Sequence, residues 1–389
     1  GWAAALPLWR ARFPAECARA LELLEGDGEP PLCSRAATEA AALLVAEGWE
    51  APSWRAIADG AEPVSRTGPA FPEPEPGEWA HGWQFYAADA REVHADRHFA
   101  ARLNATARAL LLSQRGPHAG DSLAAIPTGP ETRPRPGRFV TTLRRRAWMP
   151  LGLGDAFCPG CSAALDLHGV HLLSCMASGR VQRRAAALER AFLGICAEAG
   201  GRCQPQPLVA RLNLGPPGGQ RGEPDGRRLD FVCFGLPVFG GLPLAADVTL
   251  VSPISADGVP QSGCLSDADA VFRDAHAQIV TDYPDIAHAG RAELLCLASS
   301  TGGRWNESAL SLVRALVRVA GRSQPSVLRR SVELALTRRW WAVLSTARDE
   351  AIAASLDPAD TVDEHGLAPL DPVDVWARDS PGPSLLGAR

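Results

Sequence analysis

Hydrophobic residues recur at intervals of three and four through much of the first 150 positions, with polar residues between them. This spacing gives a helix one apolar face. We therefore predict helices over four ranges: 13–24, 34–47, 83–112 and 139–148. Ser34 suits the N-terminal cap of the second helix, Gly48 suits its end, and the third has a soft break near Arg97.

The spacing changes in the middle of the chain. After an amphipathic helix over 178–200, three short apolar runs bounded by Gly and Pro are typical of β-strands: 207–212, 228–234 and 242–251. A helix over 266–283 capped by Ser266, a buried strand over 293–298 and helices over 306–320 and 325–353 follow. The order of helix, three strands, helix, strand and helix predicts a mixed α/β (α+β) core around a mixed sheet.

Composition limits the classes of function. The chain has 389 residues, enough for two or three domains, and 46% of them are hydrophobic. No apolar run approaches the roughly 20 residues that span a bilayer, and the first residues lack the basic start of a signal peptide. We expect no membrane partner, and no small-molecule substrate is evident. Most of the ten cysteines are scattered as free thiols would be, which favours a reducing compartment, nuclear or cytoplasmic.

Charge is unevenly distributed. The net charge of −5 argues against a uniformly basic protein, and all 39 basic residues are arginines. Positions 133 to 190, however, contain ten arginines and three acids, so this segment is locally positive, as a nucleic-acid-binding surface would be. The alternative is that these arginines only form a solvated surface. The candidate phosphate contacts are Arg138, Arg144, Arg145, Arg146, Arg180, Arg183 and Arg184.

One cluster has the spacing of a metal site: Cys158-x2-Cys161-x9-His171-x3-Cys175. The Cys-Pro-Gly-Cys turn brings two thiolates to one ion, and His171 and Cys175 share a face of one helical turn. Four N/S ligands without a carboxylate indicate a closed, structural zinc site. His168 is an alternative to His171, although it would lie two turns from Cys175. No upstream His-x-Glu is present, which sets a zinc deaminase aside.

Two predicted strands each carry one acid, Asp230 and Asp247, among apolar neighbours. A carboxylate there is costly unless it is paired, hydrogen-bonded or bound to metal. Two acids on successive strands could share Mg²⁺ and cleave a phosphodiester bond. The alternative is that each acid ends a strand or caps a turn.

The order of these motifs resembles the C-terminal region of a non-LTR retrotransposon polyprotein, in which a CCHC zinc knuckle precedes a restriction-endonuclease-like domain of the PD-(D/E)-x-K type. The matching stretches are the cysteine–histidine cluster, Arg228-Leu-Asp-Phe-Val, Gly235-Leu-Pro-Val-Phe-Gly-Gly, Asp247-Val-Thr-Leu-Val-Ser-Pro, Tyr283-Pro-Asp-Ile and Thr301-Gly-Gly-Arg-Trp. Two of these, at Gly235 and Thr301, look most like retroelement-derived open reading frames of dinoflagellates. The resemblance covers roughly 82–353.

The resemblance implies structural zinc on the four cluster residues, Mg²⁺ or Mn²⁺ on Asp230 and Asp247, DNA as partner with RNA as an alternative, and a nuclear location. The sequence departs from the family in its active site. The family has a lysine on the sheet or the following helix, and this chain has none, with only Arg273 nearby. Relatives often carry an acid where Ser299 and Ser300 stand. The Tyr/Phe-x-Asp-Asp motif of a reverse transcriptase is absent, so the chain cannot polymerise DNA.

With the resemblance, the pattern divides the chain into seven segments: a helical segment 1–65, a Pro-rich linker 66–80, a helical region with a basic end 81–150, the zinc knuckle 151–178, a restriction-endonuclease-like domain 179–322, a C-terminal helix 323–355 and an acidic flexible tail 356–389. The leading hypothesis is a retroelement-derived nucleic-acid-binding protein that would nick DNA if active. The alternative is a catalytically dead relic or scaffold. A third reading is a protein-interaction module with Trp305, Trp340 and Trp341 as surface anchors.

Overall fold

The computed structural model describes residues 2–26, 32–46, 52–61, 83–153, 156–179, 181, 184–212 and 226–356. The chain forms two compact units, Gly1–Asn104 and Ala105–Arg389. Their boundary falls within the helical region expected over 81–150. The expected linker over 66–80 and the tail after Leu356 lie outside the described residues.

The first unit is helical. Its helices are α1 (Trp2–Arg12), α2 (Pro14–Glu25), α3 (Leu32–Ala46), α4 (Trp54–Ala58) and α5 (Trp83–Arg102). Pro14 occupies the first turn of α2, where its missing N–H is not needed, and Gly26 follows the last turn. The α3 helix begins at Leu32, so Ser34 lies inside it and is not its cap. A small apolar core joins α1, α2 and α4 through Leu6, Leu21 and Ile57.

The second unit is built around one four-stranded mixed sheet, as the sequence predicts. Its strands are β1 (Arg202–Pro205), β2 (Phe231–Phe234), β3 (Leu244–Val251) and β4 (Glu293–Ser300), in the order β1-β2-β3-β4. The first two pairings are antiparallel and β3 pairs with β4 in parallel. The parallel pairing needs a crossover, which α13 (Ala270–Asp282) and α14 (Pro284–Ala289) supply.

The strand predicted over 207–212 is wrong. The first strand lies earlier, at 202–205, and Val209–Leu212 forms a short helix, α12. Prolines at 205 and 207 have no N–H to give to a ladder. Beyond them, only Leu208 makes a single bridge, to Arg228.

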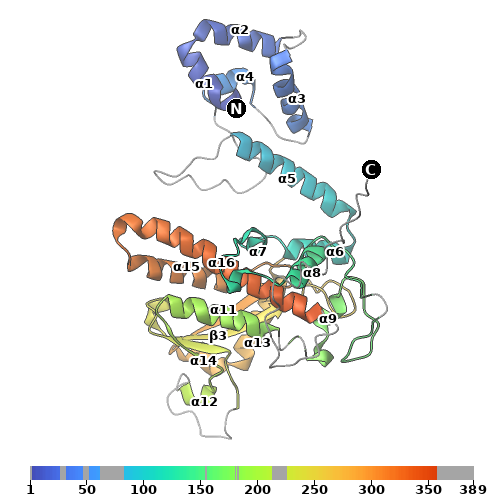
Figure 1. Ribbon diagram of the computed structural model, residues 1–389, viewed down its shortest axis with the longest axis vertical. Coiled ribbons are helices and arrows are strands. Elements are labelled where there is room, and N and C mark those ends of the chain that lie inside the picture. The colour runs from blue at the N-terminus through green and yellow to red at the C-terminus, as the bar shows by residue number, and fades with distance from the viewer. Residues whose placement is uncertain are drawn as a thin grey trace, which may run out of the picture. The chain divides into compact units, whose positions relative to one another are not determined.

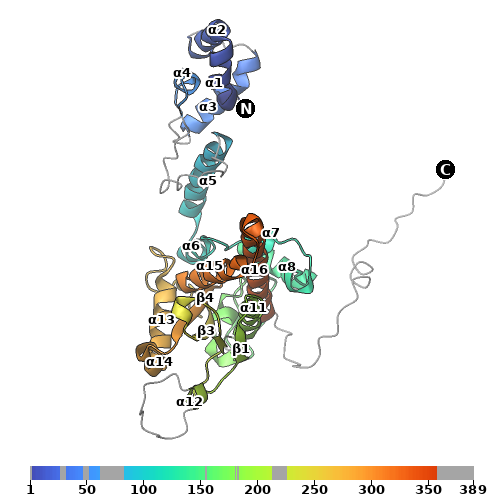
Figure 2. The same ribbon diagram turned by 90° about the vertical axis from the view of Figure 1, so that its left-hand side faces the viewer.

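Helices cover both faces of the sheet, which gives three layers (Figures 1 and 2). On one side lie α11 (Ala185–Glu198), α15 (Glu307–Arg322) and α16 (Ser326–Leu356); on the other lie α13 and α14. Alternate β3 residues divide between the two cores, with Leu244 in the α11 core and Ala245 in the α13 core. Asn306 caps α15, because its side chain accepts a hydrogen bond from the Ala309 N–H at 3.1 Å.

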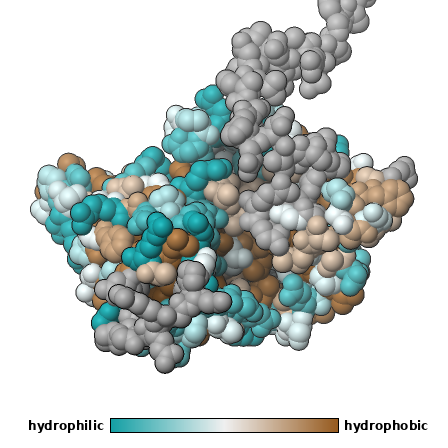
Figure 3. Space-filling view, turned by 90° about the horizontal axis from the view of Figure 1, so that it is seen from below, coloured by the Kyte–Doolittle hydropathy of each residue, from teal (hydrophilic) through white to brown (hydrophobic). Residues whose placement is uncertain are grey.

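Trp305, Trp340 and Trp341 are buried in the larger core, with at most 2% of each residue exposed. The interpretation of these tryptophans as surface anchors is therefore wrong. On the face drawn in Figure 3, hydrophilic and hydrophobic residues are intermixed. No helix within the described ranges is long and apolar enough to cross a membrane.

The remaining elements lie along α16 and near the ends of β3 and β4. They are α6 (Ala105–Ser113), α7 (Asp121–Ala124), η1 (Pro130–Thr132), α8 (Pro136–Arg146), α9 (Val170–Ser174), η2 (Met176–Ser178) and η3 (Phe239–Gly241). The predicted helix over 83–112 is thus two helices, because the chain breaks at 103–104 and not near Arg97. The loop after β4 holds α6 in place: a Cβ on Gly302 would lie 1.9 Å from Ser113 Oγ, so only glycine fits.

Candidate functional site

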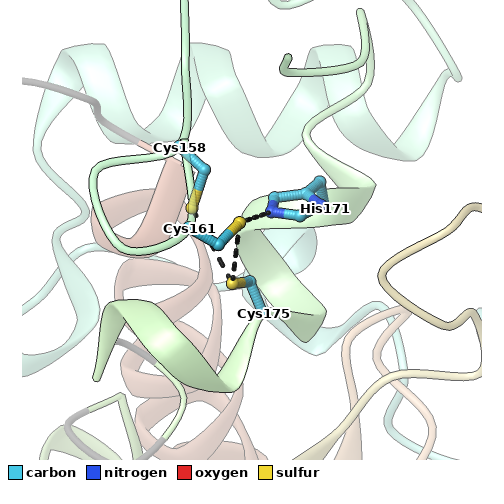
Figure 4. Close-up of side chains that lie close together, drawn as sticks. All are labelled: Cys158, Cys161, His171 and Cys175. Atoms are coloured by element: carbon cyan, nitrogen blue, oxygen red, sulfur yellow. Dashed lines mark hydrogen bonds between the residues drawn. The ribbon is translucent and has the colours of Figure 1, made fainter. Parts of the chain in front are cut away.

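The four predicted metal ligands meet at one point (Figure 4). Cys158 and Cys161 come from a turn, His171 from α9, and Cys175 from the residue after that helix. The Cys175 sulfur lies 3.7 Å from the Cys158 sulfur and 3.7 Å from the Cys161 sulfur. The Cys161 sulfur lies 3.1 Å from His171 Nε2. These side chains could hold a metal ion.

The sulfur separations fit a tetrahedral ion. With metal–sulfur bonds of about 2.3 Å, two thiolates on a tetrahedral zinc lie about 3.8 Å apart. The observed 3.7 Å agrees with this separation. The sulfur–nitrogen distance of 3.1 Å is shorter than the corresponding tetrahedral edge of about 3.5 Å, so the His171 side would open slightly around an ion.

Neighbouring groups hold His171 in the orientation that a metal ligand needs. The Asp166 carboxylate accepts hydrogen bonds from the backbone N–H groups of Val170 at 3.0 Å and His171 at 2.8 Å, which fixes the first turn of α9. His171 Nδ1 lies 3.2 Å from the carbonyl oxygen of Ala256. That oxygen can only accept, so the proton belongs on Nδ1 and the Nε2 lone pair points at the cluster.

Cys158 is also prepared as a thiolate. Burial alone would raise the pKa of its thiol, but hydrogen bonds from the Gly160 and Cys161 N–H groups, together with contacts to the His171 and Cys161 side chains, lower that pKa to about 6. The alternative ligand, His168, stacks on Trp148 with 4.0 Å between ring centroids and is not part of the cluster.

The structure also brings the two predicted carboxylates together. Asp230 directly precedes β2, and Phe231 pairs with Ala246, so one further step of the same register places Asp230 opposite Asp247. Asp230 Oδ2 accepts a hydrogen bond from the Val248 N–H at 2.7 Å. Burial and the charges of Asp230, Asp282 and Glu189 raise the pKa of Asp247 to about 7.

Sequence reasoning missed two residues beside these carboxylates. Glu189 lies on α11, and burial together with the charge of Asp230 raises its pKa. Gln206 Nε2 donates to Glu189 Oε2 at 3.1 Å and to Asp230 Oδ1 at 3.4 Å. We call Glu189, Asp230, Asp247 and Gln206 the carboxylate cluster. No local motif signals Glu189 or Gln206, because only the fold brings α11 and the end of β1 to β2.

The cysteine–histidine cluster is a more compact ligand set than the carboxylate cluster. Within the described ranges, two groups bring three or more potential ligand atoms within 4.8 Å of one another, and both are built on cysteines. One is the Cys158 cluster and the other is Cys196, Cys203 and Cys233. The carboxylate cluster is looser, with a glutamine between two of its acids.

Three of the candidate phosphate contacts have their guanidinium groups inside the protein. Arg145 is 4% exposed and donates to the His168 carbonyl and to Thr301 Oγ1, both at 3.3 Å. Arg184 is 6% exposed and donates to two backbone carbonyls. Arg146 donates to a backbone carbonyl and its pKa is lowered by burial. These contacts correct the expectation that all seven arginines reach phosphates.

The other four candidates differ among themselves. Arg144 is exposed, and Arg138 forms an ion pair with Glu350 at 2.9 Å. Arg180 and Arg183 lie outside the described residues. A surface groove of about 450 Å³ between η1, α11 and α16 holds further arginines that were not singled out in the sequence, with three glutamates: Arg133, Arg135, Arg190, Arg339, Glu131, Glu198 and Glu350.

Comparison of the sequence with models of protein families and with curated proteins gives no match.

Proposed function

We propose that the chain is a retroelement-derived nucleic-acid-binding protein whose zinc knuckle supports an endonuclease-like α/β domain, and that this domain nicks DNA with Mg²⁺ or Mn²⁺ at the carboxylate cluster. The observation that carries the proposal is the proximity of three acids: Asp230, directly before β2, Asp247 on β3, and Glu189 on α11. Burial and the charges of the other two acids raise the pKa of Asp247. The order α11, three strands, α13, β4 and α15 around a mixed sheet is the order that the hydrophobic pattern predicts.

Zinc is the metal that suits the knuckle, because three thiolates and one imidazole form a closed donor set with no position for water. Its role there is structural. The knuckle connects α8 to α11, and Arg145 and Arg184 attach it to the surrounding core through the carbonyls of His168 and Leu173. Loss of zinc would therefore loosen the support of α11, which carries Glu189.

The carboxylate cluster suits a hard cation. Its donors are oxygens, the ligand type that Mg²⁺ and Mn²⁺ prefer. Burial and repulsion by neighbouring acids raise the pKa of Asp247 to about 7, and a cation would relieve the same repulsion. When bound, Mg²⁺ would activate water and offset the charge that develops on the phosphate.

A plasmid-nicking assay tests this function. Zinc-loaded protein is incubated with supercoiled DNA and Mg²⁺ or Mn²⁺, and wild type is compared with Asp247→Ala. The matched control is Asp274→Ala, which removes an exposed carboxylate on α13. We expect nicking by wild type and the control and none by Asp247→Ala. Equal nicking by all three would contradict the role of the carboxylate cluster.

A second candidate function is a non-catalytic scaffold that binds nucleic acid without cutting it. The chain has no lysine, and Arg keeps its proton and is a poor base. In addition, the Gln206 amide already bridges Glu189 and Asp230. DNA binding by folded, zinc-loaded protein, with no nicking in either cation, would support this candidate.

A further inference from the structure

Three cysteines that have no role in the proposed function lie close together between α11 and the strands β1 and β2. Cys196 lies on α11, Cys203 on β1 and Cys233 on β2, and their sulfurs all lie within 4.8 Å of one another. They are separate from the zinc knuckle. Cys203 and Cys233 are directly opposed in the antiparallel ladder.

The geometry of the opposed pair suits a disulfide better than a metal. Opposed residues in an antiparallel ladder have Cα atoms about 4.5–5.5 Å apart, within the range that disulfides span. The sulfurs of Cys203 and Cys233 lie 2.8 Å apart. Two thiolates on one ion with bonds of about 2.3 Å lie nearly 1 Å farther apart, as the 3.7 Å separations in the zinc knuckle illustrate.

Gly201 leaves room for the contact between the Cys203 and Cys233 sulfurs. A Cβ on Gly201 would lie 2.4 Å from Cys233 Sγ, so any other residue would displace this sulfur from its present position. Cys196 and Cys233 are buried, at 0% and 1% exposed. Cys203 is only half-buried, and it lies on β1, the strand at one edge of the sheet. A reagent from solution would therefore reach Cys203 first.

Cys203 is also the thiol prepared to react. Hydrogen bonds with the Cys196 and Cys233 thiols lower its pKa to about 4. The thiolate is the nucleophilic form in disulfide exchange, and its access from solvent sets where exchange begins.

We propose that Cys203 and Cys233 form a thiol–disulfide exchange site that a small-molecule disulfide of the glutathione class oxidises to a cross-strand disulfide. The Cys203 thiolate attacks one sulfur of the small disulfide; a new S–S bond forms and one small thiolate leaves. The Cys233 sulfur, giving its proton to that thiolate, then attacks the Cys203 sulfur and expels the second small thiolate. Two protein thiols are oxidised and one small disulfide is reduced to two thiols.

Thiol mapping of the full, zinc-loaded chain tests the proposal. The protein is treated with oxidised glutathione, alkylated, and digested without reduction by trypsin and chymotrypsin for mass spectrometry. Cleavage after Arg202 separates Cys196 from Cys203, and cleavage after Phe234 separates Cys233 from Cys264. We expect a Cys203–Cys233 linked peptide, while Cys264 and Cys296, two buried cysteines outside this cluster, remain alkylated as controls.

Variants assign the order of the steps. Cys233→Ser should stop at a glutathione adduct on Cys203, Cys203→Ser should give neither adduct nor link at this site, and Cys196→Ser should still form the link. Free Cys203 and Cys233 after treatment of wild type would overturn the proposal. So would a link from Cys203 to Cys196, or protection of all three thiols by one equivalent of Zn²⁺ in a Cys158→Ser/Cys161→Ser variant.

Discussion

Replacing Asp247 by Asn should stabilise the second unit, and the gain should grow with pH. Burial and neighbouring acids raise the pKa of Asp247 from an ordinary value of 3.8 to about 7 in the folded state. Between those pH values the folded state holds a proton that the unfolded state has lost, so stability falls as pH rises through this window. Asn does not titrate, so the Asp247→Asn variant should not lose stability in this way as the pH rises.

The size of the effect follows from the pKa values. Each tenfold change in proton affinity corresponds to about 1.4 kcal/mol, so a rise from pH 5.5 to pH 8 costs the folded Asp247 form about 2 kcal/mol, most of it below pH 7. The advantage of Asp247→Asn over wild type should therefore grow by about 2 kcal/mol between pH 5.5 and pH 8.

Urea unfolding of zinc-loaded protein, followed by fluorescence of the buried Trp305, Trp340 and Trp341, measures this difference. Asp274→Asn, which changes an exposed acid on α13, is the control and should show no such pH dependence. A stability difference between Asp247→Asn and wild type that is the same at both pH values would refute the reasoning.

Further predictions concern three arginines and a glycine. Arg144→Ala should weaken DNA binding, measured by filter binding over a salt series, without changing stability. Arg145→Ala should instead lower the midpoint of urea unfolding, because its guanidinium forms hydrogen bonds inside the protein. Arg348→Met removes three hydrogen bonds from a side chain that is 0% exposed and should cost about 3–5 kcal/mol in the same urea assay. Gly302→Ala should cost more than about 1 kcal/mol, because its Cβ would overlap Ser113; a stability equal to wild type would contradict the packing of this loop.

Local patterns predicted the features that depend on few residues. The strand Leu244–Val251 and the four ligands of the cysteine–histidine cluster follow from spacings that the sequence shows directly. Apolar alternation failed at 207–212, where Pro207 has no N–H for a ladder and Val209–Leu212 forms a helix. A short apolar run does not by itself show whether another strand pairs with it.

Other features depend on contacts between distant parts of the chain. Arg144, Arg145 and Arg146 are adjacent and chemically equal, yet α8 exposes the first and buries the second against the His168 carbonyl and Thr301. Gln206 meets Glu189 only because β1 returns beside α11. The sequence alone cannot rank such residues, because their burial is decided by the packing of elements that lie far apart along the chain.

The four-ligand centre is central to the proposed function, and X-ray absorption at the zinc edge tests it most directly. Protein purified with zinc should retain one ion at this centre, with three sulfur ligands at about 2.3 Å and one nitrogen at about 2.0 Å, and the spectrum should change in Cys161→Ser. Protein that retains no zinc, or zinc bound by oxygen ligands and indifferent to Cys161→Ser, would contradict the assignment of Cys158, Cys161, His171 and Cys175.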